Sequence, residues 1–97
     1  MTAGRDPVAV AALQYCAAGT AEETLRTLMP LIDRAADDGA KLVCLPEAAT
    51  FLAASRAALA DEAEPAGESP VLDRLCNAAA RRGIELSIGS MFFLGPD

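Results

Sequence analysis

Three short apolar runs, each bordered by polar or turn-forming residues, mark out the chain. They cover Val8–Gln14, Leu42–Leu45 and Glu85–Phe93. Short runs of this kind, rich in valine, leucine and isoleucine, are typical of buried β-strands. Pro46 has no amide hydrogen and restricts the backbone of the residue before it, so it fixes the end of the second run. The pattern therefore predicts three strands.

Between the first two runs, apolar residues recur with helical spacing. Thr20 and Glu23 fit a capping box, in which the threonine hydroxyl accepts from the Glu23 amide and the glutamate reaches back. The predicted helix runs to about Asp38, and Gly39 suits the left-handed position that follows a helix. Pro30 lacks an amide hydrogen and crowds the preceding turn, so we expect a kink or a restart there. The predicted apolar stripe consists of Leu25, Leu28, Met29, Ile32, Ala35 and Ala36.

Two more helices are predicted between the second and third runs. Residues 48–60 are rich in alanine, which favours a helix. Residues 61–68 are acidic and contain proline and glycine, so we expect a solvated surface loop, with a lid beside a site as the alternative. Ser69 and Pro70 are typical first residues of a helix, which Gly83 would end. The predicted buried stripe of this helix is Leu72, Leu75, Cys76 and Ala79.

The order of elements indicates the fold class. Strands alternate with segments long enough to cross over between parallel neighbours, which is typical of an α/β fold with a parallel sheet. A chain of 97 residues has room for one domain, which we take as residues 1–97. We therefore predict a single α/β unit with three strands and about three helices.

The charge balance excludes two classes of partner. The chain has eight lysines and arginines against fourteen acids, a net charge of −6, and no basic patch that would meet phosphates. Its first residues lack the basic and apolar segments of a signal peptide, and no run approaches the ~20 apolar residues of a membrane span. We therefore expect neither nucleic acid nor a membrane among its partners.

Cysteine and histidine usage argues against metal and disulfide sites. Histidine is absent, and Cys16, Cys44 and Cys76 form no C-x-x-C pair. Neither a zinc knuckle nor a disulfide framework is supported by this spacing. We expect no metal or cofactor and a cytoplasmic location, where thiols stay reduced.

Glu47 is the strongest candidate for chemistry. In open α/β sheets, ligands bind at the carboxyl ends of the strands, and Glu47 lies two residues past the second run. Its neighbours in sequence are apolar, so we expect a desolvated carboxylate, which favours the protonated form and makes a better base once ionised. The competing interpretation is an ordinary glutamate that caps a helix or lies in water.

The ordered set of elements resembles the start of the carbon–nitrogen hydrolase (nitrilase) superfamily. The resemblance covers about Val8 to Leu94, and its sharpest part is the hydrophobic-hydrophobic-Leu-Pro-Glu element at Val43–Glu47. The strand before it and the "ARRGIELSIGS" strand after it add to the likeness. The stretches "GESPVLDRLCNAAARRGI" and "IGSMF" are most similar to Nit-type amidases, which include the deaminated-glutathione amidases.

The resemblance implies a fold and a mechanism. Members have an αββα sandwich and a Glu-Lys-Cys triad, and Glu47 matches the glutamate that takes a proton from the cysteine thiol. The thiolate attacks an amide or nitrile carbon, and the lysine stabilises the charge on the tetrahedral intermediate. The implied substrate is a small amide or nitrile, and the implied assembly is a homo-oligomer formed through the sandwich.

The other two members of the triad find no match in this sequence. Lys41 precedes the second strand, so over ~10 Å of extended chain separates it from Glu47. We expect Cys44 and Cys76 to be buried packing residues, and Cys16, after the first strand, to be structural. The sequence thus predicts the N-terminal portion of a hydrolase domain, truncated after the third strand. We expect this portion alone to be inactive and prone to associate.

Two other function classes remain open from the residues. A small-molecule binding module is suggested by "CAAGTAEET", where helix amides after a strand bind anions, although Glu22 and Glu23 would repel phosphate. An interaction module is suggested by the open sheet edge. Co-purifying absorbance would favour the first, and concentration-dependent association the second.

Overall fold

The protein is an α/β unit built on a small parallel sheet. The computed structural model describes residues 7–95, so the predicted domain extends past the described residues at both ends. Strands β1 (Val10–Ala12), β2 (Leu42–Cys44) and β4 (Glu85–Ser87) lie in that spatial order, with β2 in the centre and every pairing parallel. The predicted fold class is confirmed, although each strand is shorter than its apolar run.

The third apolar run does not form one strand. After β4 the chain leaves the sheet, and a separate strand, β5 (Phe93–Leu94), pairs in parallel with β3 (Glu64–Pro65). The prediction of one strand over residues 85–93 is therefore wrong. The chain departs from the sheet near Gly89, where its backbone passes directly against the backbone of Leu45 and Pro46.

Helix α1 (Ala21–Asp37) begins and ends as its sequence indicates. The Thr20 side chain accepts from the Glu23 amide, which confirms the first half of the capping box. Gly39 has a φ of 98° and donates its amide to Ala36, which closes the helix with a left-handed residue. The helix continues through Pro30 as one element, so of the two alternatives, a kink or a restart, the restart is wrong. Pro30 is exposed, and water can therefore satisfy the carbonyl that proline leaves without a donor.

Two side chains cap the N-terminus of helix α3 (Pro70–Arg82). Ser69 accepts from the amide of Leu72 and donates its hydroxyl to a Glu64 carboxylate oxygen at 2.7 Å. The same oxygen of Glu64 accepts from the Val71 amide. Gly83 ends the helix with a φ of 64°, as predicted. Two first-turn amides are thus satisfied by side chains, which couples this helix to β3.

The alanine-rich segment after β2 is mostly not helical. Helix α2 covers only Arg56–Glu62, with Ser55 as its N-cap, so the prediction of a helix over residues 48–60 is wrong for its first half. Thr50 and Phe51 are buried there, and such tertiary packing overrides the intrinsic helix propensity of alanine. The predicted acidic surface loop, 61–68, begins inside α2 and contains β3.

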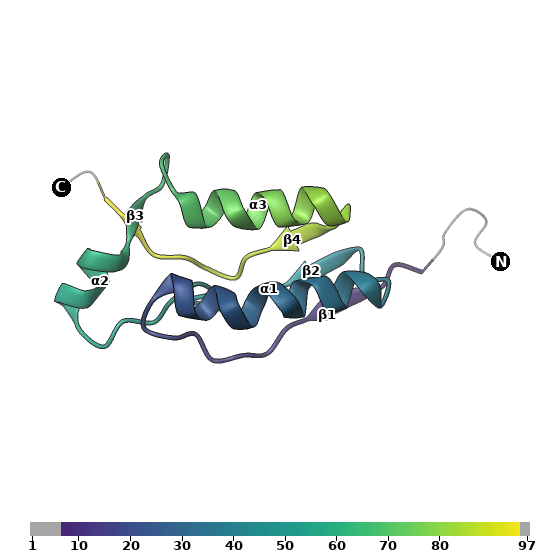
Figure 1. The fold of residues 1–97 in the computed structure, drawn as a ribbon, viewed down its shortest axis with the longest axis horizontal. Helices are drawn as coiled ribbons and strands as arrows, with labels where there is room; N and C mark the ends of the chain where they lie inside the picture. Colours follow the sequence, from purple (N-terminus) through teal and green to yellow (C-terminus); the bar gives the residue numbers. More distant parts are fainter. Residues whose placement is uncertain (1–6, 96–97) are drawn as a thin grey trace.

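Helices α1 and α3 lie side by side over one face of the sheet (Figure 1). Ion pairs Arg74–Glu22 and Arg82–Asp37 join them on the solvent side. The middle residue of each sheet strand faces this helical layer, and Val43 of the central strand is fully buried. The core between helices and sheet consists of Leu25, Leu28, Ile32, Ala35, Ala40, Val43, Leu45, Ala49, Leu75 and Ile84.

The opposite face of the sheet, which we call the bare face, is not covered by any helix that the structure describes (Figure 1). Side chains alternate between the two faces of a strand, so the outer residues of each strand point to this side. Val10 is 57% exposed, and Leu42 and Cys44 are half-buried. Cys44, expected to be buried, is only half-buried, because it lies on the bare face.

Candidate active site

Glu47 lies at the carboxyl end of the central strand, as predicted, but its side chain is exposed. The expected desolvation is therefore wrong for the described chain. The apolar neighbours turn inward instead, because Leu45, Ala49 and Phe51 are all buried in the core. The carboxylate projects from a loop whose other residues anchor it, and is open to any group that approaches the end of the sheet.

The loop that carries the carboxylate, residues 46–52, is called the Glu47 loop below, and its backbone has an unusual conformation. Ala48 has a φ of 50°, the only positive φ of a non-glycine residue in the described chain. Such a conformation costs free energy and persists only where surrounding contacts determine it. The Ser90 hydroxyl accepts from the Ala48 amide at 2.8 Å, and the Ser90 carbonyl accepts from the Ala49 amide at 2.9 Å. One residue thus fixes the two peptide groups that follow Glu47.

Gly89 allows the close approach of the two segments. A Cβ atom at this position would lie 2.6 Å from the carbonyl carbon and oxygen of Pro46 and 2.7 Å from the Leu45 oxygen. Real Cβ atoms essentially never come so near to backbone atoms. Only glycine therefore lets the chain after β4 pass against the residues before Glu47.

A third segment supports the loop from the side of β1. The Tyr15 hydroxyl donates to the Ala49 carbonyl at 2.7 Å, and the Leu52 amide donates to the Ala18 carbonyl at 2.8 Å. Residues 15–18 and the Glu47 loop therefore run beside each other. Segments that follow all three sheet strands thus converge on the backbone around Glu47 and hold it in place.

The pKa of Tyr15 provides a test of its burial beside the Glu47 loop. Burial raises the pKa of Tyr15 from 10.0 to about 12. Because this folded-state pKa lies above the unfolded one, the stabilisation from Tyr15 is present below pH 10 and lost as the pH rises through about 12. The chain has one tyrosine and no tryptophan, so absorbance near 295 nm follows this group alone. We expect a titration midpoint near pH 12 in the folded chain and near 10 in denaturant. A midpoint near 10 in both would contradict the burial of the Tyr15 hydroxyl beside the Glu47 loop.

The remaining sequence candidates do not join Glu47 in a triad. Lys41 is exposed before β2, and its backbone pairs with Ala9 and Glu85 at the opposite end of the sheet. Cys76 is exposed, so its predicted burial is wrong, because Ala78 takes the inner position of α3. Cys16 is also exposed, in the segment beside the Glu47 loop. Within the described residues, no group of three or more cysteine or acidic side chains is arranged to hold a metal ion.

A comparison with known protein families identifies the family of this chain. The family model for carbon-nitrogen hydrolase matches residues 8–94, which is nearly the whole chain. The chain belongs to the carbon–nitrogen hydrolase family. The family match spans β1 through β5, so it includes both the Glu47 loop and the residues that hold it. Among the described residues, no helix is long and apolar enough to cross a bilayer.

The sequence predicted Glu47 as the candidate residue but not the residues that hold its loop. Tyr15, Gly89 and Ser90 each contact the Glu47 loop from a distant part of the chain. A signal existed in the Gly-Ser pair inside an otherwise apolar run, since glycine within a strand pattern often marks close backbone approach. The single tyrosine after the first strand offered no comparable signal.

Proposed function

We propose that this chain supplies the general base of a hydrolase that cleaves carbon–nitrogen bonds in small amides or nitriles. Glu47 is that base. The observation that carries the proposal is how Glu47 is held. Its exposed carboxylate lies at the end of the central strand, on a strained loop. Hydrogen bonds to Ser90 and Tyr15 and the close approach of Gly89 hold that loop in place. Strained backbone of this kind clusters at functional sites.

The proposed reaction begins with proton transfer from a cysteine thiol to the Glu47 carboxylate. The thiolate then attacks the carbonyl carbon of an amide, and a lysine stabilises the negative charge on the tetrahedral intermediate. The carbon–nitrogen bond breaks, and the protonated Glu47 returns its proton to the departing amine. Water attacks the resulting thioester, which releases the acid and restores the thiol.

We propose that the lysine and the cysteine come from polypeptide outside residues 1–97. Lys41 lies at the far end of the sheet from Glu47, and Cys44 and Cys76 lie in β2 and on α3. Cys16 is exposed after β1, beside the Glu47 loop, but it matches no motif of the family resemblance. The purified chain alone should therefore hydrolyse neither amides nor nitriles. The direct test is a chimera in which residues 8–94 replace the matching segment of an active family member. Measurable amide hydrolysis by the chimera would support the proposal, and turnover by the 97-residue chain alone would contradict the assignment of the missing groups.

The finer placement within the family is also a proposal. The stretches around Ser69 and Gly89 support the Nit-type amidase branch, and hydrolysis of small amides in preference to nitriles by the chimera would test it. Three free cysteines suit a reducing compartment, which supports a cytoplasmic location.

The bare face supports the proposal that the protein assembles into homo-oligomers. Val10 is 57% and Val8 65% exposed, and exposed apolar surface of this kind favours association. We expect sedimentation velocity to show a mass that rises with protein concentration. Val10→Asp should shift the chain toward monomer, because it places a charge on the surface that becomes buried. Ala54→Asp, an equal charge change at an exposed loop position, should not. A concentration-independent monomer would contradict association through this face.

A further inference from the structure

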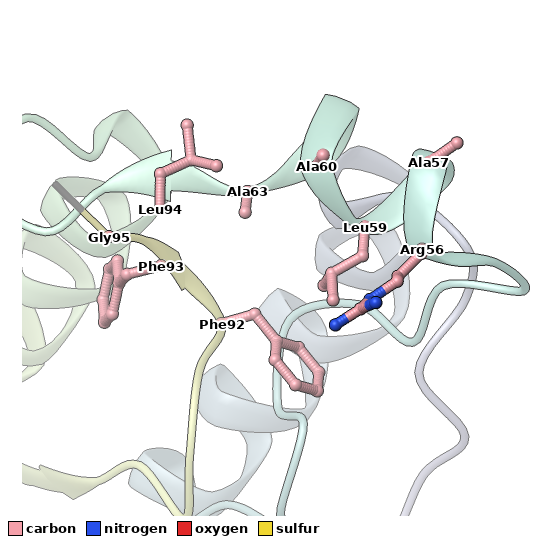
Figure 2. Close-up of a pocket in the computed structure, with 9 residues that line it drawn as sticks. All are labelled: Arg56, Ala57, Leu59, Ala60, Ala63, Phe92, Phe93, Leu94 and Gly95. Atoms are coloured by element: carbon pink, nitrogen blue, oxygen red, sulfur yellow. The ribbon is translucent and has the colours of Figure 1, made fainter. Parts of the chain in front are cut away.

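A cavity separate from the Glu47 carboxylate lies between α2 and β5. Its volume is about 690 Å³, which falls within the range of small-molecule sites. Figure 2 shows the side chains of Leu59 and Phe92 facing each other across it, with Phe93 and Leu94 following along the strand. The Phe92 ring also packs on Phe51, at a centroid distance of 5.7 Å, which links the cavity wall to the end of the Glu47 loop.

One charged group lies among these apolar side chains. Of the described residues that line the cavity, only Arg56 is charged, and its guanidinium extends from the start of α2 toward the Phe92 ring (Figure 2). Within residues 7–95, no carboxylate forms an ion pair with Arg56. A guanidinium beside apolar and aromatic surface is suited to bind a carboxylate through two parallel hydrogen bonds.

Two of the acids near the cavity in sequence make contacts elsewhere. A carboxylate oxygen of Glu62 accepts from the Ala21 amide at 3.1 Å, at the start of α1. Glu64 caps α3 through Ser69 and Val71. Although the chain has a net charge of −6, Arg56 is the one charged side chain among the described residues that line the cavity. The cavity thus combines an apolar wall with one positive charge at its edge.

We propose that this cavity binds a small organic anion with an apolar body, whose carboxylate pairs with Arg56 and whose hydrocarbon part packs on Leu59 and Phe92. The proposal goes beyond the hydrolase function, because binding here requires neither Glu47 nor a nucleophile. An anionic ligand is favoured over a neutral one of the same shape, since the guanidinium supplies the directional contact.

The probes for the test are 3-phenylpropionate and its neutral analogue 3-phenylpropan-1-ol. Amide chemical shifts of the isotope-labelled 97-residue chain are followed during titration with each compound. With the acid, we expect shifts to concentrate at residues 56–60 and 92–95. The alcohol should bind about threefold to tenfold more weakly, which is the range for a partly exposed charge-assisted contact. Shifts confined to β1 and β2 would place the probe on the bare face and overturn the proposal.

Two arginine variants separate the local contact from overall charge. Arg56→Gln should weaken binding of the acid to the level of the alcohol and leave binding of the alcohol unchanged. Arg26→Gln removes the same charge from an exposed position of α1 and should change neither affinity. Equal affinity of the acid for the wild-type chain and for Arg56→Gln would overturn the proposal. Ala60→Phe, which fills the cavity from the exposed side of α2, should weaken both probes; unchanged binding would also overturn it.

Discussion

Glu47→Gln in the chimera should reduce kcat/KM for a primary amide by about 10²–10⁴-fold, the range that a positioned general base contributes. Glutamine has the shape and hydrogen-bonding reach of glutamate but cannot accept the thiol proton at neutral pH. Because Glu47 is exposed, the substitution should change the free energy of unfolding by no more than about 0.5 kcal/mol. The measurements are steady-state hydrolysis and thermal unfolding of the same preparations.

A matched control tests whether the loss is specific to the position. Glu68→Gln makes the same chemical change at another exposed glutamate, in the turn between β3 and α3. It should leave both hydrolysis and unfolding unchanged. Alkylation of the nucleophilic cysteine by iodoacetamide adds a second readout, since the rate should fall in Glu47→Gln if the carboxylate promotes thiolate formation. A Glu47→Gln chimera that keeps more than about a tenth of the activity would rule out the role of general base.

The parts of the fold that the sequence predicted are those set by local signals. Thr20 and Ser69 start α1 and α3 where their side chains cap the first turn, and Gly39 and Gly83 end them with positive φ. The contacts of these four residues join positions three or four apart in sequence. The parallel sheet also followed from the sequence, because each apolar run is separated from the next by enough residues for a crossover.

The parts that were wrong depend on contacts between distant segments. Residues 48–55 have the composition of a helix, yet Thr50 and Phe51 are buried and the backbone bonds to Tyr15 and Ser90. Strands β3 and β5 have two residues each, which is too short for a periodic signal. In α3 the buried stripe lies on a different side of the helix from the predicted one. Ala78 is buried, and Cys76, which was expected to be buried, is exposed.

Prediction of the candidate site divides in the same way. Glu47 was predicted from its position at the end of a buried strand. An apolar run followed by proline marks such a strand end, and ligands bind at the carboxyl ends of strands in α/β sheets. The exposure of the Glu47 side chain could not be predicted from the sequence, because the apolar residues next to it turn away into the core. The direction in which each loop residue points is decided by partners more than thirty residues away, such as Tyr15 for Ala49 and Ser90 for Ala48.

Gly89→Ala should therefore be among the most damaging single-methyl changes in the chain. The added Cβ would lie 2.6 Å from the Pro46 backbone, so one of the two segments must move. Movement breaks the bonds from Ser90 to Ala48 and Ala49, and it opens the contact between β4 and the Glu47 loop. We expect a loss of about 2–4 kcal/mol in the free energy of unfolding, the range for overpacking combined with lost hydrogen bonds. Urea denaturation followed by circular dichroism measures it.

Gly89→Ala should also impair function in the protein that remains folded. A positioned base loses efficiency when its backbone shifts by about 1 Å, so the chimera with Gly89→Ala should lose about 10²-fold in kcat/KM under conditions where it remains folded. Gly67→Ala is the matched control, because a Cβ at Gly67 meets no atom within 4 Å and its φ is not in the left-handed region. It should leave stability and hydrolysis unchanged. If Gly89→Ala were as stable and active as Gly67→Ala, the close approach of Gly89 to Pro46 would not be what positions Glu47.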